Sequence, residues 1–232
     1  ARLELYGGRC NCSYWHGAFG GTYLPHLRNA VYEHLIAADN LLDEAEGRGL
    51  ATGDRPWVEL TSGDYNFDGR QEIRLASNRL IALVSPANGG HLYELDVRSI
   101  FHNLLATLTR REEAYHAKVR AGESAADGNV ASIHDRVVFK QAGLDQRLQF
   151  DNYERKTLVD HFYPMDASVD AVADGHAPEM GDFVSNSFEA KLRRGGDRMQ
   201  LQLIRDGHAG NHPVRITKGV TLEAGDDVLE IA

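Results

Sequence analysis

The sequence predicts a mainly β protein: an antiparallel β-sandwich preceded by an aromatic loop and an α-helix. Short apolar runs separated by turn residues recur through residues 57–232, which is typical of a sandwich. Residues 23–46 instead place apolar side chains three and four positions apart, as one face of a helix requires. The first 21 residues are rich in glycine and aromatic residues. We therefore expect two domains, residues 1–56 and 57–232.

The individual elements follow from local signals. Pro25 suits the first turn of the helix, and Gly47 suits its end. Strands are expected at residues 71–76, 79–84, 91–97, 214–222 and 228–231, and where Met199, Leu201 and Leu203 alternate with polar residues. A helical insert is expected at residues 105–120, with loops at residues 121–132 and 166–178.

Composition narrows the classes of function. The chain has 232 residues, with 25 Lys+Arg against 34 Asp+Glu, a net charge of −9. This acidic balance argues against a nucleic-acid partner, because phosphate binding needs clustered cations. The apolar runs are too short for a transmembrane helix, and the first residues lack the apolar stretch of a signal peptide. The two cysteines, Cys10 and Cys12, cannot form a disulfide framework, so we expect a cytoplasmic location.

The most unusual segment is the aromatic loop around Asn11, Tyr14, Trp15 and His16. Flat aromatic faces stack on the C–H faces of sugar rings, while Asn, His and Tyr hydrogen-bond hydroxyl groups. The loop therefore fits a sugar-binding surface. Two other interpretations remain open: a core-filling loop that caps the helix, and a zinc site formed by the two cysteines and His16.

A second motif, D-x-N-x-D-G-x-x-E, predicts a structural calcium site between strands. Alternate oxygens can surround the cation, and Gly69 permits the sharp turn. It is not a complete EF-hand, because Leu75 stands where the bidentate Glu of that loop belongs. A polar turn is the other interpretation. The expected ligands are Asp64, Asn66, Asp68, the Arg70 carbonyl and Glu72.

Long stretches resemble one known family. Residues 10–28, CNCSYWHGAFGGTYLPHLR, are similar to the last conserved region of glycoside hydrolase family 57, in its 4-α-glucanotransferase/α-amylase type. Residues 85–96, SPANGGHLYELD, resemble a signature of that family's β-domain. Residues 103–116 and 158–162 resemble the family as well, so the resemblance spans nearly the whole chain.

The resemblance implies a fold and a substrate. Residues 1–56 would be the helical end of the catalytic barrel region. Residues 57–232 would be a galactose-mutarotase-like supersandwich, truncated at its C-terminus. The substrate would be an α-1,4-glucan or maltooligosaccharide. Tyr14, Trp15 and His16 match family positions that line the substrate cleft, and Asn11 matches as well. Cys12 departs from the Asp that some relatives carry, so it cannot supply the same charged acceptor.

The resemblance also implies that catalytic residues are absent from this chain. In the family, a glutamate nucleophile and an aspartate acid/base act with retention from a (β/α)₇ barrel, and their motifs precede the aromatic segment. The chain alone would then be inactive and would support a cleft completed by the missing N-terminal barrel. A non-catalytic carbohydrate-binding or structural module is the alternative. An epimerase using His91, His161 or Glu189 is a third class, by analogy of fold alone.

Overall fold

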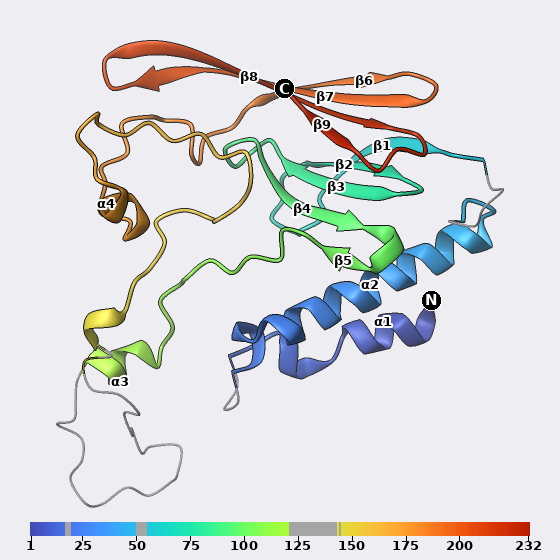
Figure 1. Cartoon of the computed structure of the whole chain (residues 1–232), viewed down its shortest axis with the longest axis horizontal. Helices are drawn as coiled ribbons and strands as arrows, with labels where there is room; N and C mark the ends of the chain where they lie inside the picture. The colour runs from blue at the N-terminus through green and yellow to red at the C-terminus, as the bar shows by residue number, and fades with distance from the viewer. Residues whose placement is uncertain (17–19, 50–54, 121–142, 144) are drawn as a thin grey trace, which may run out of the picture. The chain divides into compact units, whose positions relative to one another are not determined.

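The computed structural model describes residues 1–16, 20–49, 55–120, 143 and 145–232 (Figure 1). These residues form two compact units. The first unit contains Ala1–Leu108, Lys156–Pro164 and Glu179–Ala232, and the second contains Thr109–Arg155 and Met165–Pro178. The chain is mainly antiparallel sheet with few helices, as the sequence predicts. The boundary expected near residue 56 stays a prediction.

The first unit begins with a helix where a loop was expected. Helix α1 spans Arg2–Gly8, and α2 spans Pro25–Ala45, close to its predicted bounds. The loop prediction for the first residues was wrong because Gly7 and Gly8 are not turn residues. They allow α1 to approach α2: a Cβ at Gly8 would lie 3.0 Å from the side chain of Leu35. Glu4 and His34 join the same two helices at 2.7 Å.

The first sheet follows as an antiparallel meander, with strands in sequence order. Three of its strands, β2, β3 and β4, confirm the predicted ones within one residue. The outer strands were not predicted: β1 lacks clear alternation, and β5 has two residues. The strands are β1 Val58–Gly63, β2 Glu72–Ser77, β3 Leu80–Ser85, β4 His91–Val97 and β5 His102–Asn103, with the 3₁₀ turn η3 (Arg98–Ile100) before β5.

The second sheet is built around a long hairpin. Strands β7 and β8 pair over their whole length, while β6 and β9 form the two edges. Strand β6 was not predicted, because its sequence EAKLRR is charged and mostly exposed, as a loop would be. The strands are β6 Glu189–Arg194, β7 Arg198–Ala209, β8 His212–Glu223 and β9 Leu229–Ile231.

The core lies between the two sheets, which confirms the predicted sandwich. Each sheet contributes alternate apolar side chains from its inner face, and two phenylalanines fill the space beside them. Its most deeply buried members include Leu75, Val84, Leu92, Phe183, Leu201, Leu203, Val220 and Leu222.

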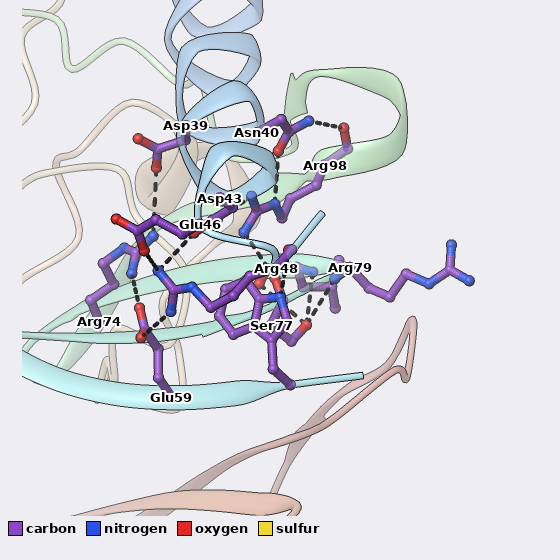
Figure 2. A network of polar contacts seen from close by, with 12 residues as sticks. Asp39, Asn40, Asp43, Glu46, Arg48, Glu59, Arg74, Ser77, Arg79 and Arg98 are labelled. Carbon is purple, nitrogen blue, oxygen red and sulfur yellow. Dashed lines mark hydrogen bonds and ion pairs between the residues drawn. The ribbon is translucent and has the colours of Figure 1, made fainter. Parts of the chain in front are cut away.

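Helix α2 is fixed to the first sheet by a polar network, shown in Figure 2. Arg98 is fully buried and donates to Asp43 at 2.5 Å and to Asn40 at 2.8 Å, both on α2. It also donates to the Ser77 carbonyl at 3.0 Å. Arg48 bridges Asp43 and Glu59 of β1, at 2.8 and 2.9 Å. Buried charges of this kind are stable only when fully paired, so the network determines where α2 lies on the sheet.

The helical insert predicted at residues 105–120 was wrong for most of its length. Only His116–Arg120 is helical there, as α3, and residues 105–115 are not. Arg110 does not lie on a helix: its side chain and backbone N–H bind Asp151 at 2.6–3.0 Å. The expected loop at residues 121–132 lies outside the described residues. The unit also contains η5 (Asp145–Arg147) and α4 (Val169–Ala173), the latter within the loop expected at residues 166–178.

Among the described residues, no helix is both long enough and apolar enough to cross a membrane.

Candidate functional site

The aromatic loop leaves α1 through a short 3₁₀ turn, η1 (Asn11–Ser13). The Asn11 carbonyl accepts from the backbone N–H of Tyr14 at 3.1 Å, and the Tyr14 hydroxyl donates back to the Gly8 carbonyl at 2.6 Å. The phenol is thus held at its polar end, while 58% of the residue stays exposed. The sequence therefore folds the loop back onto α1 and leaves the ring available on the surface.

The other side of the loop is held by Gly21, in the 3₁₀ turn η2 (Gly21–Tyr23). Gly21 has φ +49°, and a Cβ there would lie 1.9 Å from the Trp15 carbonyl oxygen. That carbonyl accepts from the Thr22 N–H at 2.8 Å, and Arg28 of α2 donates to the Thr22 carbonyl at 2.6 Å. Only glycine permits this close approach. The hydrogen bonds that result hold the backbone of Trp15 in place, although its side chain is half exposed.

The predicted sugar-contact residues lie together in this loop. Trp15 and His16 have ring centroids 5.4 Å apart with planes at 56°, and both residues are exposed. Asn11 is exposed at the start of the loop. An aromatic surface with polar tips can stack on a sugar ring and hydrogen-bond its hydroxyls. The sugar-contact roles stay predictions; Phe19, in the same segment, lies outside the described residues.

The acidic motif forms a tight loop between β1 and β2. Asp64 accepts from the backbone N–H groups of Asp68 and Gly69, each at 3.0 Å. Asn66 accepts from the Asp68 N–H at 2.9 Å, and Asp68 accepts from the Arg70 N–H at 2.8 Å. Gly69 has φ +82°, as the predicted sharp turn requires. The backbone is therefore wound around its own side-chain oxygens.

Glu72 closes this loop from a fully buried position at the start of β2. Its Oε2 accepts from the N–H groups of Tyr65 and Asn66, at 2.9 and 3.4 Å. Its Oε1 is buried and has no hydrogen-bond partner within the described structure. In the described ranges, no three His, Cys, Asp or Glu side chains are already gathered as a metal site.

A cavity of about 830 Å³ lies elsewhere in the first unit, and the sequence did not predict it. Two carboxyl groups, Glu94 and Asp96, line it from the outer face of the first sheet. Acidic residues at alternate positions of a strand usually mark a solvated face, so the sequence alone does not distinguish these two. The sequence does contain one signal for this cavity: α2 has an apolar face, and such a face has to pack against another surface, here that of a sheet.

The residues considered for an epimerase come from three separate segments of the first unit. His91 is buried at the start of β4, and burial beside Lys156 and Lys218 lowers its pKa to about 4. His161 pairs with Glu179 at 2.7 Å. Glu189 is exposed on β6 and contacts Lys191 at 3.5 Å. Across the residues that the structure describes, no hydrogen bond or ion pair joins these three candidates.

Comparison with known proteins decides the family. The model of the family described as "Alpha-amylase/4-alpha-glucanotransferase, C-terminal" matches residues 64–232, which is most of the chain. The chain belongs to this family. The model of the middle domain of the same proteins matches residues 1–42, so helices α1 and α2 correspond to that part of the α-amylases and 4-α-glucanotransferases.

Individual members of the α-amylase/4-α-glucanotransferase family give the same result. The chain is 37% identical to "Alpha-amylase 1" of Dictyoglomus thermophilum over 87% of its length, and 34% identical to the "4-alpha-glucanotransferase" of Thermococcus kodakarensis over 96%. It spans 27% and 31% of those two proteins. The crystal structure of the Thermococcus litoralis 4-α-glucanotransferase matches 96% of the chain at 29% identity, with a TM-score of 0.68 and 30% of that protein covered.

Proposed function

We propose that the chain acts as the C-terminal region of an α-1,4-glucan-processing enzyme and supports a substrate cleft that it does not complete. Residues 1–56 would close the barrel region, and residues 57–232 would form the sandwich beside it. The catalytic carboxylates would lie in a (β/α)₇ barrel outside these 232 residues, so the chain alone would not cleave glucans. The exposed thiols of Cys10 and Cys12 suit a reducing, cytoplasmic location.

The observation that carries this proposal is the loop geometry. Tyr14 and Trp15 are half exposed, yet the backbone on both sides of them is fixed by hydrogen bonds. An exposed aromatic ring on a fixed backbone loses little entropy when it binds, which suits a contact with a glucose ring. The names of the relatives, α-amylase and 4-α-glucanotransferase, indicate the substrate class. Trp15 would stack on a glucosyl ring, while Tyr14, His16 and Asn11 would contact its hydroxyls.

Trp15→Ala tests this role. Maltotriose should bind the 232-residue chain, with loss of tryptophan fluorescence as Trp15 becomes covered, and no products of other lengths should form. Removing the ring should weaken this binding about tenfold or more, because covering an aromatic face contributes about 1.5–3 kcal/mol. The measurement is a fluorescence and calorimetric titration, with chromatography of the sugars afterwards.

Tyr6→Ala is the matched control, since Tyr6 is an exposed aromatic residue on α1 outside the loop. It should leave the affinity unchanged. If Trp15→Ala and Tyr6→Ala both bind maltotriose as the unaltered chain does, the loop is not a sugar contact, and the structural-module alternative is favoured. If the chain alone forms longer and shorter oligosaccharides, the proposed location of the carboxylates is wrong.

We also propose that the loop Asp64–Glu72 binds a structural calcium ion. The residues fit the ion: oxygen ligands alternate along the loop, and the buried Glu72 has one carboxylate oxygen without a hydrogen-bond partner among the described residues. A buried, unpaired carboxylate oxygen costs stability, and a cation would offset that cost. Asp64, Asn66, Asp68, the Arg70 carbonyl and Glu72 would hold the ion.

Calcium should therefore raise the melting temperature of the chain. At a concentration one hundred times its dissociation constant, a ligand of the folded state alone adds about 2.7 kcal/mol of stability. Asp68→Ala and the isosteric Glu72→Gln should abolish the increase, whereas Asp226→Asn, an exposed site outside the loop, should retain it. An equal calcium effect in all of these variants would place the ion elsewhere, and no effect in the unaltered chain would refute the site.

A further inference from the structure

The cavity of about 830 Å³ in the first unit is separate from the aromatic loop. Helices α1 and α2 line one side of it, through residues such as Leu5 and Leu35, and the outer face of β2, β3 and β4 lines the other. Tyr65 and Asn66 of the acidic loop line it as well. None of its lining residues belongs to the segment between Gly7 and Arg28. Its volume is within the range of small-molecule sites, which run from about 300 to 1,000 Å³.

A β-bulge supplies the polar groups of this cavity. In the pairing of β3 with β4, Leu83 lies opposite Glu94 and Val84 lies opposite Leu92, so Tyr93 is the extra residue. Leu92 faces the core, and Tyr93, Glu94 and Asp96 all line the cavity. Regular alternation would have sent Tyr93 and Glu94 to opposite faces of the sheet. The bulge brings both of them to the same space.

These groups have unused hydrogen-bonding capacity. Asp96 is only 3% exposed, and its Oδ1 has no hydrogen-bond partner in the described structure. The buried hydroxyl of Tyr93 is likewise unpaired within the described residues. Such atoms are costly unless water or a ligand satisfies them. They therefore indicate an occupant that offers hydrogen bonds at two or more points.

The charge of the cavity restricts the occupant further. Burial, together with the charge of the neighbouring Glu94, raises the pKa of Asp96 to about 9. Burial also raises the pKa of Glu94. Lys156 lowers the pKa of Glu94, while Asp39 of α2 raises both pKa values and Arg74 of β2 lowers both. A carboxyl pair that keeps a proton near neutral pH is a mixed donor and acceptor, unlike the ionised oxygens that a divalent cation needs.

We infer that this cavity binds a neutral carbohydrate, a short α-glucan of two or three rings, at a second site apart from the aromatic loop. Each sugar hydroxyl both donates and accepts, so it can satisfy the Asp96 carboxyl and the Tyr93 hydroxyl together. The walls include the aromatic side chain of Tyr32, which suits the C–H faces of sugar rings. The choice of an α-glucan among carbohydrates rests on the proposed function; the cavity itself requires only a neutral polyol.

The test is a maltotriose titration of the Trp15→Ala chain by calorimetry and amide NMR. One site should remain, with shifts at β4 and α2. In this background Tyr93→Phe should weaken binding about fivefold, the loss expected for one neutral hydrogen bond. Asp96→Leu should weaken it more than tenfold, whereas Asp96→Asn, which keeps a donor and an acceptor, should bind within about threefold of the parent. Tyr6→Phe, outside the cavity, should change nothing.

The outcomes separate this inference from the proposed function. If the loop binds no sugar, the unaltered chain shows a single site that Trp15→Ala leaves intact and Asp96→Leu removes. If the cavity binds no sugar, Trp15→Ala removes all binding, and the inference fails. It also fails if Tyr93→Phe and Asp96→Leu both keep the affinity of their Trp15→Ala parent. The NMR spectrum of each variant shows whether it is folded.

Discussion

Asp96 lies on the outer face of a sheet and is nevertheless buried, because α2 covers that face. Desolvation disfavours a charge there, and the neighbouring Glu94 disfavours it further, so the pKa of Asp96 rises to about 9. His91 shows the opposite response to burial, since its charged form is the protonated one and its pKa falls to about 4. The same physical effect therefore moves these two groups in opposite directions.

These two groups predict how stability depends on pH. Between about pH 4 and 6.5 the folded state binds one proton fewer at His91 and one more at Asp96 than the unfolded state. The two groups therefore change the free energy of unfolding in opposite directions as the pH rises. Above pH 6.5, Asp96 is the one of these two groups that still contributes, and its contribution to the free energy of unfolding should fall by up to about 1.4 kcal/mol per pH unit towards pH 9. Urea unfolding at pH 7, 8 and 9 measures it.

Asp96→Asn should flatten this slope and should be the more stable protein at pH 9, because it removes one of the two buried acids. Asp226→Asn, an exposed site, should follow the unaltered chain. A slope that persists in Asp96→Asn would mean that other groups release the protons.

At the scale of the element, the sequence predicts segments that have a repeating pattern of apolar residues. It misses segments whose structure depends on particular local contacts. Short apolar runs between turn residues located β2, β3 and β4, and alternation located part of β7. Three- and four-residue spacing located α2, because a buried face imposes a period on the sequence. Strand β6 was missed because its exposed, charged residues carry no such period. Helix α1 was missed because Gly7 and Gly8, which permit its contact with α2, are read as turn residues.

The candidate sites show the same difference in how well the sequence predicts them. The aromatic loop and the acidic loop are continuous in sequence, so Trp15 and Glu72 could be singled out without a structure. The cavity is not continuous, because it needs a bulge at Tyr93 and a helix packed on the sheet. A bulge shifts the alternation by one residue, and nothing in the local composition marks where that happens.

The attachment of α2 gives a prediction at this scale. Asp43→Ala leaves the fully buried Arg98 without its carboxylate and should destabilise the protein by about 3–5 kcal/mol. Asp206→Ala is the matched control: its ion pair with Arg215 is as short, at 2.6 Å, but both side chains are about two-thirds exposed. That change should have little effect. Similar losses in the two variants, measured by urea unfolding, would show that burial is not what makes the contact important.

At the scale of the whole first unit, Lys218 and Arg194 of the second sheet both donate hydrogen bonds to backbone carbonyls outside that sheet. Lys218 of β8 is buried, donates to the Gly89 carbonyl at 2.8 Å and the Leu158 carbonyl at 2.5 Å, and pairs with Asp160 at 2.5 Å. Its ammonium also lies 4.4 Å from the centre of the Phe188 ring. Burial lowers the pKa of Lys218, and Asp160 opposes that shift. Lys218 thus supplies polar contacts between the second sheet and the segments around Gly89 and Leu158.

Lys218→Met keeps the apolar stem and removes the charge. It should cost about 3–5 kcal/mol, because two carbonyls and a carboxylate lose their partner. Lys191→Met removes an exposed lysine of β6, paired with Glu189 at 3.5 Å, and should be nearly neutral. Chemical unfolding of both variants makes the comparison. Equal stabilities would mean that the carbonyls find water in place of Lys218.

The two edges of the second sheet offer different surfaces to another copy of the chain. Strand β6 presents Lys191, Arg193 and Arg194 along its length, and a second β6 laid against it would meet like charge. Strand β9 is short, and both Ile231 at its end and Val228 just before it are about half exposed. Self-association by strand pairing is therefore directed towards β9. A charged residue at Val228 or Ile231 is the substitution that should keep the protein monomeric at the high concentrations that weak sugar binding demands.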